Sequence, residues 1–221
     1  MLVEILNSGS DGNCTILEDI NGNQILLDCG LSYETIMNNS SFSKISCVLV
    51  GHFHKDHSKS LSKFQKYYFQ CYTPENIVDG KLIDTDFWKI IPMKLIHNVE
   101  CFGFLIYSKI EKKKIVYMTD TTYIPKINWQ EIDCWIQDVN YSQEMVLAAM
   151  SEGKQVNVGY RNHCSVEQVA DYILEYNIRP KNFVAFHLSN SGLTSVDKTK
   201  EKLSPLVDNL IISAPNTQFE I

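Results

Sequence analysis

A dense group of metal-ligand residue types lies in the first half of the chain. The segment 51–57, Gly-His-Phe-His-Lys-Asp-His, places three imidazoles and a carboxylate within six residues, directly after an apolar segment. His52 and His54 are two residues apart, so in an extended backbone they project to the same side and could share one cation. Asp56 and His57 follow where the chain turns toward a helix, which could direct them to a second cation. Such nitrogen and carboxylate ligands suit Zn²⁺, Mn²⁺ or Fe.

A polar loop with incidental histidines is the alternative interpretation of this run. It is disfavoured because crowded imidazoles repel one another when protonated, unless a metal or solvent separates them. The other three histidines, His97, His163 and His187, also fall at strand ends or beside turns. Asp120 ends the apolar segment 114–120 and supplies a carboxylate able to bridge two cations, which would otherwise repel each other strongly. The pattern therefore predicts a dinuclear metal site.

Two kinds of periodicity predict the elements that must position these residues. β-rich apolar segments predict strands over 2–6, 14–18, 24–28, 45–51, 87–93, 101–108 and 114–120, the first three joined by hairpin turns at 8–13 and 21–23. Helical periodicity predicts helices over 58–67, 142–151, 165–176 and 196–203, alternating with strands over 133–139, 182–188 and 209–214. We expect two sheets packed face to face with helices outside, in one domain spanning residues 1–221.

Composition narrows the class of protein. The 221 residues are 44% apolar, and no segment approaches the roughly 20 apolar residues that span a membrane. Because the N-terminal segment also lacks a basic region followed by an apolar run, we expect a cytoplasmic protein without a membrane partner. The seven cysteines contain no Cys-x-x-Cys pair, which favours reduced, buried thiols. A net charge of −6 gives no sign of a basic face for a long polyanion, although composition cannot show a local basic groove.

The order of the metal-ligand residues resembles that of the metallo-β-lactamase superfamily along nearly the whole chain. The resemblance implies an α/β (α+β) fold, a four-layer αββα sandwich, with two divalent ions, zinc as the first candidate and manganese as the second. It implies one metal held by His52, His54 and His97, the other held by Asp56, His57 and His187, and Asp120 bridging both. Asp28, in Leu-Asp-Cys-Gly at 27–30, matches the superfamily's first motif, an aspartate that supports the HxHxDH loop.

Two segments of the second half resemble ribonuclease Z and its shorter bacterial and phage relatives. Asn-His-Cys-Ser at 162–165 opens a helix one helix before His187, and in those relatives the equivalent of His163 donates a proton to the leaving group. The segment 133–141 resembles a strand that usually carries Glu where this chain has Asp138, the expected partner of His163. The chain has no room for the large insertion of the β-CASP nucleases. Between Asp120 and His163 it lacks the Gly/Pro-rich arm with which ribonuclease Z grips tRNA.

The resemblance is closest to the small phosphodiesterase-like members, which include double-strand DNA exonucleases and phage anti-Pycsar enzymes that open cyclic mononucleotides. It implies a metal-dependent phosphodiesterase acting on a small or cyclic nucleotide, with His163, Asp138 and Asp56 as catalytic residues. The alternatives are a DNA or RNA nuclease of the exonuclease type, a non-catalytic metal-binding protein, and a thioesterase or lactonase. A complete ligand set argues against the non-catalytic protein. The nearest relatives also imply a homodimer.

Overall fold

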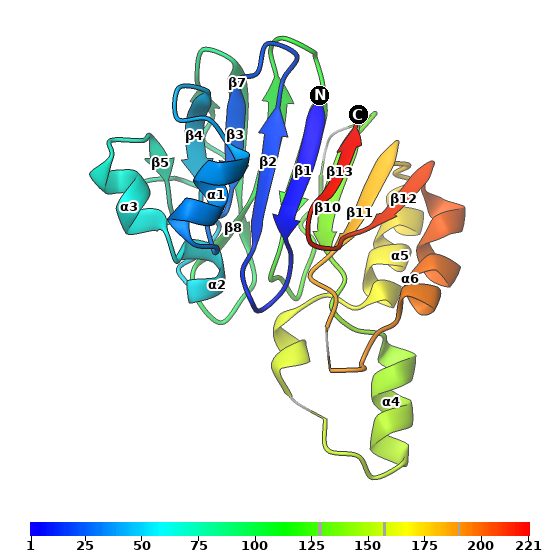
Figure 1. Ribbon diagram of the computed structural model, residues 1–221. Coiled ribbons are helices and arrows are strands. Elements are labelled where there is room, and N and C mark those ends of the chain that lie inside the picture. The colour runs from blue at the N-terminus through cyan, green and yellow to red at the C-terminus, as the bar shows by residue number, and fades with distance from the viewer. Residues whose placement is uncertain (128–129, 157, 190) are drawn as a thin grey trace.

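Two β-sheets face each other in the computed structural model, which describes residues 1–127, 130–156, 158–189 and 191–221 (Figure 1). The first sheet consists of β1 (Leu2–Asn7), β2 (Cys14–Glu18), β3 (Gln24–Leu27), β4 (Ile45–Leu49), β5 (Cys71–Tyr72) and β13 (Thr217–Glu220), in the order β13-β1-β2-β3-β4-β5. The second sheet consists of β6 (Ile83–Asp84), β7 (Trp88–Leu95), β8 (Cys101–Ser108), β9 (Lys114–Met118), β10 (Cys134–Asp138), β11 (Asn182–Phe186) and β12 (Asn209–Ile212), in the order β12-β11-β10-β9-β8-β7-β6.

Helices cover the outer faces of both sheets. Those beside the first sheet are α1 (Tyr33–Asn39), α2 (Lys55–Ser58) and α3 (Leu61–Lys66). Those of the second half are α4 (Gln143–Ser151), α5 (Val166–Glu175) and α6 (Val196–Leu203), with short 3-10 turns at Val158–Asn162 and Ser204–Leu206. Figure 1 shows α5 and α6 against the second sheet, whereas α4 projects away from both sheets. The order of the layers is therefore helix, sheet, sheet, helix, as the resemblance implied.

Three apolar cores hold the layers together. The middle core lies between the sheets and includes Ile5, Leu17, Phe104 and Phe186, all fully buried. The outer cores pack α1 and α3 on the first sheet and α5 and α6 on the second. Burial of this apolar area is the dominant favourable term in folding. All seven cysteines are buried and unpaired, as predicted.

The topology of the second sheet brings candidate functional side chains together at one edge. Strands β9, β10, β11 and β12 run parallel to one another, so their carboxyl ends meet at the same edge. Asp120 follows β9, Asp138 ends β10, and His187 follows β11. The crossover helix α5 begins at Ser165, whose side chain and that of Gln168 form a reciprocal capping box. The capped start of α5 therefore holds the backbone in place two residues after His163.

Most of the predicted strands and helices are present, but their ends differ. The predicted strands 24–28, 114–120 and 182–188 stop at Leu27, Met118 and Phe186, because residues beyond these ends turn sharply. The predicted helix 58–67 is shorter, at Leu61–Lys66, and α2 precedes it. The sequence patterns missed the elements α1, β5, β6 and β13. Strands of two to four residues, such as β5, β6 and β13, are formed by long-range pairing and leave little periodic pattern. Within the described residues, no helix is both long and apolar enough to cross a membrane.

Candidate metal centre

Three functional residues leave their strands in left-handed backbone conformations. Asp28, Asp120 and His187 have φ of 59°, 54° and 56°, directly after or close behind β3, β9 and β11. Non-glycine residues rarely adopt this region, and such conformations concentrate at functional sites. The turns end the strands earlier than the apolar pattern predicts. They also bring the carboxylate of Asp120 and the imidazole of His187 to the common edge of the two sheets.

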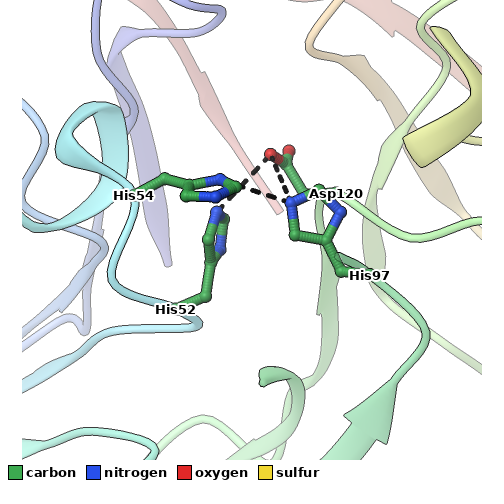
Figure 2. Close-up of side chains that lie close together, drawn as sticks. All are labelled: His52, His54, His97 and Asp120. Carbon is green, nitrogen blue, oxygen red and sulfur yellow. Dashed lines mark hydrogen bonds and ion pairs between the residues drawn. The ribbon is translucent and has the colours of Figure 1, made fainter. Parts of the chain in front are cut away.

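The first group of candidate ligands contains His52, His54, His97 and Asp120 (Figure 2). One nitrogen or oxygen from each residue lies within 4.8 Å of the others. His52 Nε2 and His97 Nε2 lie 3.6 Å and 3.9 Å from Asp120 Oδ2, and His97 Nε2 is 3.3 Å from His54 Nδ1. His52 and His54 share one side of an extended segment, as their spacing predicted.

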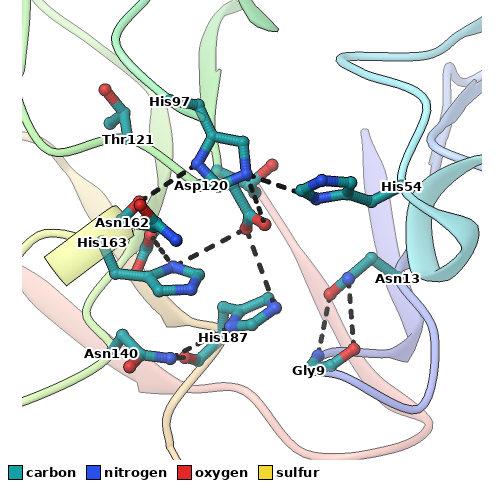
Figure 3. A network of polar contacts seen from close by, with 12 residues as sticks. Gly9, Asn13, His54, His97, Asp120, Thr121, Asn140, Asn162, His163 and His187 are labelled. Carbon is teal, nitrogen blue, oxygen red and sulfur yellow. Dashed lines mark hydrogen bonds and ion pairs between the residues drawn. The ribbon is translucent and has the colours of Figure 1, made fainter. Parts of the chain in front are cut away.

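The second group contains Asp56, His57, His187 and, again, Asp120. His57 Nε2 lies 3.4 Å from Asp120 Oδ2, whereas His187 Nε2 lies 3.7 Å from Asp120 Oδ1. His187 Nε2 is also 3.9 Å from Asp56 Oδ2. Figure 3 shows Asp120 between His54 and His97 of the first group and His187 of the second. Asp120 Oδ2 therefore lies near histidines of both groups and Oδ1 lies near His187, so this carboxylate is within reach of both groups, as a bridge between two cations requires.

The donor atoms fit divalent cations. Among the described residues, seven buried side-chain atoms have no hydrogen-bond partner, and three of them are His52 Nε2, His187 Nε2 and Asp120 Oδ1. Buried polar atoms are nearly always paired, and an unpaired one costs about 1–3 kcal/mol. These three atoms belong to the groups described above, and five imidazoles with two carboxylates form the kind of site that Zn²⁺ and Mn²⁺ occupy.

The electrostatic surroundings favour the metal-binding forms of Asp120 and His52. Burial opposes ionisation of Asp120, but the neighbouring His187 and His57 hold its pKa well below the usual range. Burial, together with the adjacent His57, lowers the pKa of His52 to about 3. An ionised carboxylate and a neutral imidazole are the forms that bind a metal.

Asp28 supports the histidine loop from behind. Its Oδ2 lies 2.7 Å from His57 Nδ1 and accepts a bond from Tyr117 Oη at 2.6 Å, and its Oδ1 accepts from the Gly51 N–H at 2.9 Å. A carboxylate only accepts, so His57 Nδ1 carries the proton and Nε2 keeps its lone pair for a cation. The position of Asp28 agrees with the supporting role that the resemblance implied.

Gly30 allows the two loops to approach each other. A Cβ at this position would lie 1.7 Å from the backbone oxygen of Asp56. The Gly30 N–H donates to the carbonyl of Asn13, and the Asn13 N–H donates to the carbonyl of Asp56 at 2.7 Å. Glycine is therefore needed for the contact that holds Asp56 at the site.

Two asparagines at the site were missed by the sequence analysis. Asn13 Nδ2 lies 2.9 Å from His57 Nε2 and 3.4 Å from Asp56 Oδ2. Asn140 Nδ2 lies 3.2 Å from His187 Nδ1 and donates to the carbonyl of His187 at 2.9 Å. Both asparagines lie in connecting segments outside the strands and helices, where Asn is common for purely local reasons, so residue type alone gave no signal.

His163 and Asp138 form a separate polar pair beside the cluster. His163 Nδ1 lies 2.7 Å from Asp138 Oδ2, and Asp138 is fully buried at the end of β10. Burial lowers the pKa of His163, but the charge and hydrogen bond of Asp138 outweigh this and raise the pKa to about 9. The shorter Asp side chain therefore still reaches the imidazole. The nitrogen of His163 that contacts Asp138 is also 3.9 Å from Asp120 Oδ1, which places the pair against the bridge.

A cavity of about 450 Å³ opens over this cluster. His54, Asp56, His97, Asp120, His163 and His187 contribute to its floor. Its other lining residues include Ser10, Asn140, Tyr160, Asn162, Leu188, Ser189 and Leu193. The ring of Tyr160 packs edge-on against Tyr141, with centroids 4.9 Å apart. The cavity therefore joins a polar floor to a partly apolar wall.

Comparison with known proteins identifies the architecture. No protein-family model and no curated protein sequence matches this chain. Among solved structures, the metallo-β-lactamase fold protein YhfI from Bacillus subtilis matches with a TM-score of 0.74 at 14% identity, over 100% of this chain and 99% of the other. The chain has the metallo-β-lactamase fold.

Two further solved structures have a fold similar to that of this chain. Human tRNase Z, short form, matches with a TM-score of 0.68 at 14% identity, over 100% of this chain and 99% of the other. A diphosphatase of the PhnP family matches with a TM-score of 0.67 at 15% identity, over 100% of this chain and 97% of the other. At these identities the likeness concerns the fold.

The structure brings together every site residue that the sequence singled out. The seven predicted metal ligands fall into the two groups sharing Asp120, and His163 and Asp138 lie beside them. Asp56 lies in the second group and also lines the cavity, next to Ser10. The metallo-β-lactamase fold therefore positions a candidate metal centre and a candidate proton donor at the same edge of the sandwich.

Proposed function

We propose that this chain is a metal-dependent hydrolase of nucleotide phosphodiesters, with a small or cyclic nucleotide as its substrate. The observation that carries the proposal is the His163–Asp138 pair beside two ligand groups that share Asp120. This arrangement sets a proton donor next to a place for two cations. Among the solved structures of similar fold, one is named as a tRNase Z and another as a diphosphatase, which supports a phosphate ester as substrate.

The proposed ligands divide between two divalent ions, Zn²⁺ or Mn²⁺. One ion would be held by His52, His54 and His97, the other by Asp56, His57 and His187, and Asp120 would be shared by both. When bound, the cations supply Lewis acidity that polarises the phosphoryl oxygens and lowers the pKa of the attacking water. The chain itself fixes the ligand loops through Asp28, through the Asn13 N–H, which donates to the Asp56 carbonyl, and through Asn140.

His163 is the proposed proton donor to the leaving group. Its Nδ1–H is held by Asp138 Oδ2, which leaves Nε2 as the nitrogen for the substrate. The carboxylate of Asp138 stabilises the imidazolium, so a proton on Nε2 can pass to the departing oxygen as the P–O bond breaks. An alkoxide leaves poorly without such a proton. Asp138 positions His163 and does not meet the substrate.

The cavity walls support a nucleotide as the bound group. A volume of about 450 Å³ lies within the 300–1,000 Å³ typical of small-molecule sites. Tyr160, Leu188 and Leu193 provide an apolar and aromatic wall on which a base could stack. Asn162 and Ser189 provide polar side chains near the same wall for the base or sugar edges.

A substrate panel with metal analysis on the same preparation tests the proposal. We expect about two metal ions per chain, because the proposed ligands form two sites. We expect hydrolysis of bis(p-nitrophenyl) phosphate and of at least one nucleotide among cyclic mononucleotides, linear DNA and linear RNA. A chelator should abolish it, and Zn²⁺ or Mn²⁺ should restore it. A thioester and a lactone serve as controls for carboxyl substrates. Trace metal, with no phosphodiester hydrolysis after adding either ion, would remove the proposal.

A further inference from the structure

A second cavity adjoins the one over the candidate metal centre. It has a volume of about 300 Å³ and is lined by Ser10, Asp11, Gly30, Lys55, Asp56 and Lys59. Ser10 and Asp56 line both cavities, so the two meet beside a proposed metal ligand. A substrate bound in the first cavity can therefore extend directly into the second.

Two lysines give the second cavity its charge. Lys55 is the first residue of α2, and Lys59 follows its last turn with helical φ and ψ of −50° and −38°. Residues four apart on a helical turn lie on the same face. Both lysines are exposed, and in the described part of the chain neither has an ion pair or a hydrogen bond. Lys63, one turn further along, is by contrast paired with Glu34.

The second cavity also contains two carboxylates, of which Asp56 belongs to the second ligand group. Asp56 is already engaged, with His57 Nε2 at 3.5 Å and His187 Nε2 at 3.9 Å, which leaves Asp11 as the opposing carboxylate. The backbone N–H groups of Ser10 and Asp11 have no hydrogen-bond partner among the described residues, and neither does the hydroxyl of Ser10. Two ammonium groups with free N–H donors are the chemistry that binds a phosphate.

The position of the lysines relative to His163 indicates which part of the substrate they meet. His163 lines the first cavity and not the second. In Figure 3 it lies on the opposite side of Asp120 from the turn that contains Gly9 and Asn13, and this turn flanks the second cavity. Because His163 is the proposed donor to the leaving group, the lysines lie on the side of the group that stays attached to the scissile phosphate.

We propose, on the basis of the proposed function, that Lys55 and Lys59 bind a second phosphate carried by the nucleoside that remains on the scissile phosphate. The substrate class is then a nucleotide with at least two phosphates, such as the end of a short linear oligonucleotide. A cyclic mononucleotide has a single phosphate and leaves the lysines without a partner. The inference thus separates two substrates that the first cavity alone does not distinguish.

Four chromogenic probes test this inference in two matched pairs. Thymidine 5′-(p-nitrophenyl phosphate) is compared with the same compound bearing a 3′-phosphate, and thymidine 3′-(p-nitrophenyl phosphate) with the same compound bearing a 5′-phosphate. In every probe p-nitrophenol leaves and the thymidine stays on the scissile phosphate. The readout is the ratio of kcat/KM with the second phosphate to kcat/KM without it. Because both probes use the same enzyme sample, this ratio cancels differences in metal content or folded fraction.

For at least one pair we expect a ratio of about 10 or more in the parent, the size of one charge-assisted hydrogen bond. The ratio should fall to within about twofold of unity when Lys55→Met and Lys59→Met are combined, and it should also fall as salt is raised. Lys66→Met, on the exposed surface of α3 and outside both cavities, should keep the parent's ratio.

The outcomes separate this inference from the proposed function. Hydrolysis of the probes with ratios near unity in the parent would overturn the phosphate site and leave the phosphodiesterase intact. A high ratio that survives the double substitution would also overturn it, as would an equal loss in Lys66→Met. If metal-loaded protein hydrolyses none of the four probes and no other phosphodiester, the proposed function falls and this inference falls with it.

Discussion

Replacing Asp28 with asparagine tests whether one buried carboxylate fixes the metal-binding form of His57. The carboxylate of Asp28 accepts from three donors, His57 Nδ1–H, Gly51 N–H and Tyr117 O–H. Asparagine keeps the size of the side chain but offers only one acceptor oxygen and adds an amide N–H₂. In either orientation of the amide, therefore, a donor faces a donor.

The expected magnitude follows from that mismatch. A buried donor without an acceptor costs about 1–3 kcal/mol. For a chain of this size that corresponds to a fall in melting temperature of about 2–12 °C for the metal-free protein. If the amide N–H₂ faces His57, the imidazole must move its proton to Nε2, which removes the lone pair that a cation needs. Loss of such a support typically lowers metal affinity by about 10–100-fold.

Two measurements check the prediction. Competition with a chromogenic chelator gives the metal affinity, and circular dichroism gives the melting temperature of metal-free Asp28→Asn. Tyr117→Phe is the matched control, because it removes one donor and keeps the carboxylate. Its metal affinity should stay closer to the parent's. Parent-like affinity in Asp28→Asn, together with an unchanged melting temperature, would refute the reasoning.

The remaining predictions concern ligands, the proton donor and a glycine. His54→Ala and Asp56→Ala should each abolish phosphodiester hydrolysis and leave the circular dichroism spectrum folded, since each removes a ligand; near-parent turnover in either would contradict its role. His163→Ala should keep the parent's metal content and lower the rate by about 10²–10⁴ on a nucleotide substrate. The loss should be smaller on bis(p-nitrophenyl) phosphate, whose leaving group departs without a proton, and equal losses would point to a structural role. Gly30→Ala should lower the melting temperature and the metal content, because its Cβ would meet the Asp56 carbonyl at 1.7 Å; a parent-like protein would mean that the loop shifts freely.

The sequence predicted the candidate site better than the elements around it. The HxHxDH run follows β4 and extends into α2, and its residue types and spacing indicated candidate ligands without knowledge of the fold. His97, Asp120 and His187 were predicted individually because each ends an apolar segment. Their grouping depends on parallel pairing of β9, β10 and β11, which a sequence pattern does not specify.

What the sequence could not predict lies mainly in long-range contacts. Asn13 and Asn140 act through side-chain bonds to residues 44 and 47 positions away. Tyr117 lies in the core, and its hydroxyl contact with Asp28 spans 89 positions. Because this chain has Asp138 where the relatives usually have Glu, the sequence did not show whether the carboxylate pairs with His163. The geometry at the end of β10 shows that the shorter side chain reaches the imidazole.

The pairing of β13 with β1 bears on how this chain folds. Thr217 to Glu220 pair with Ile5 to Leu2, so β1 lies between β2, whose paired residues are 7 to 16 positions away in sequence, and β13, whose paired residues are more than 200 positions away. Local hairpins such as β1–β2 form within microseconds, whereas distant contacts must first overcome a large loop-closure entropy. During synthesis one edge of β1 therefore stays unpaired until β13 has left the ribosome. Such an edge is a template for pairing with another chain, so we expect early refolding intermediates to be where aggregation begins.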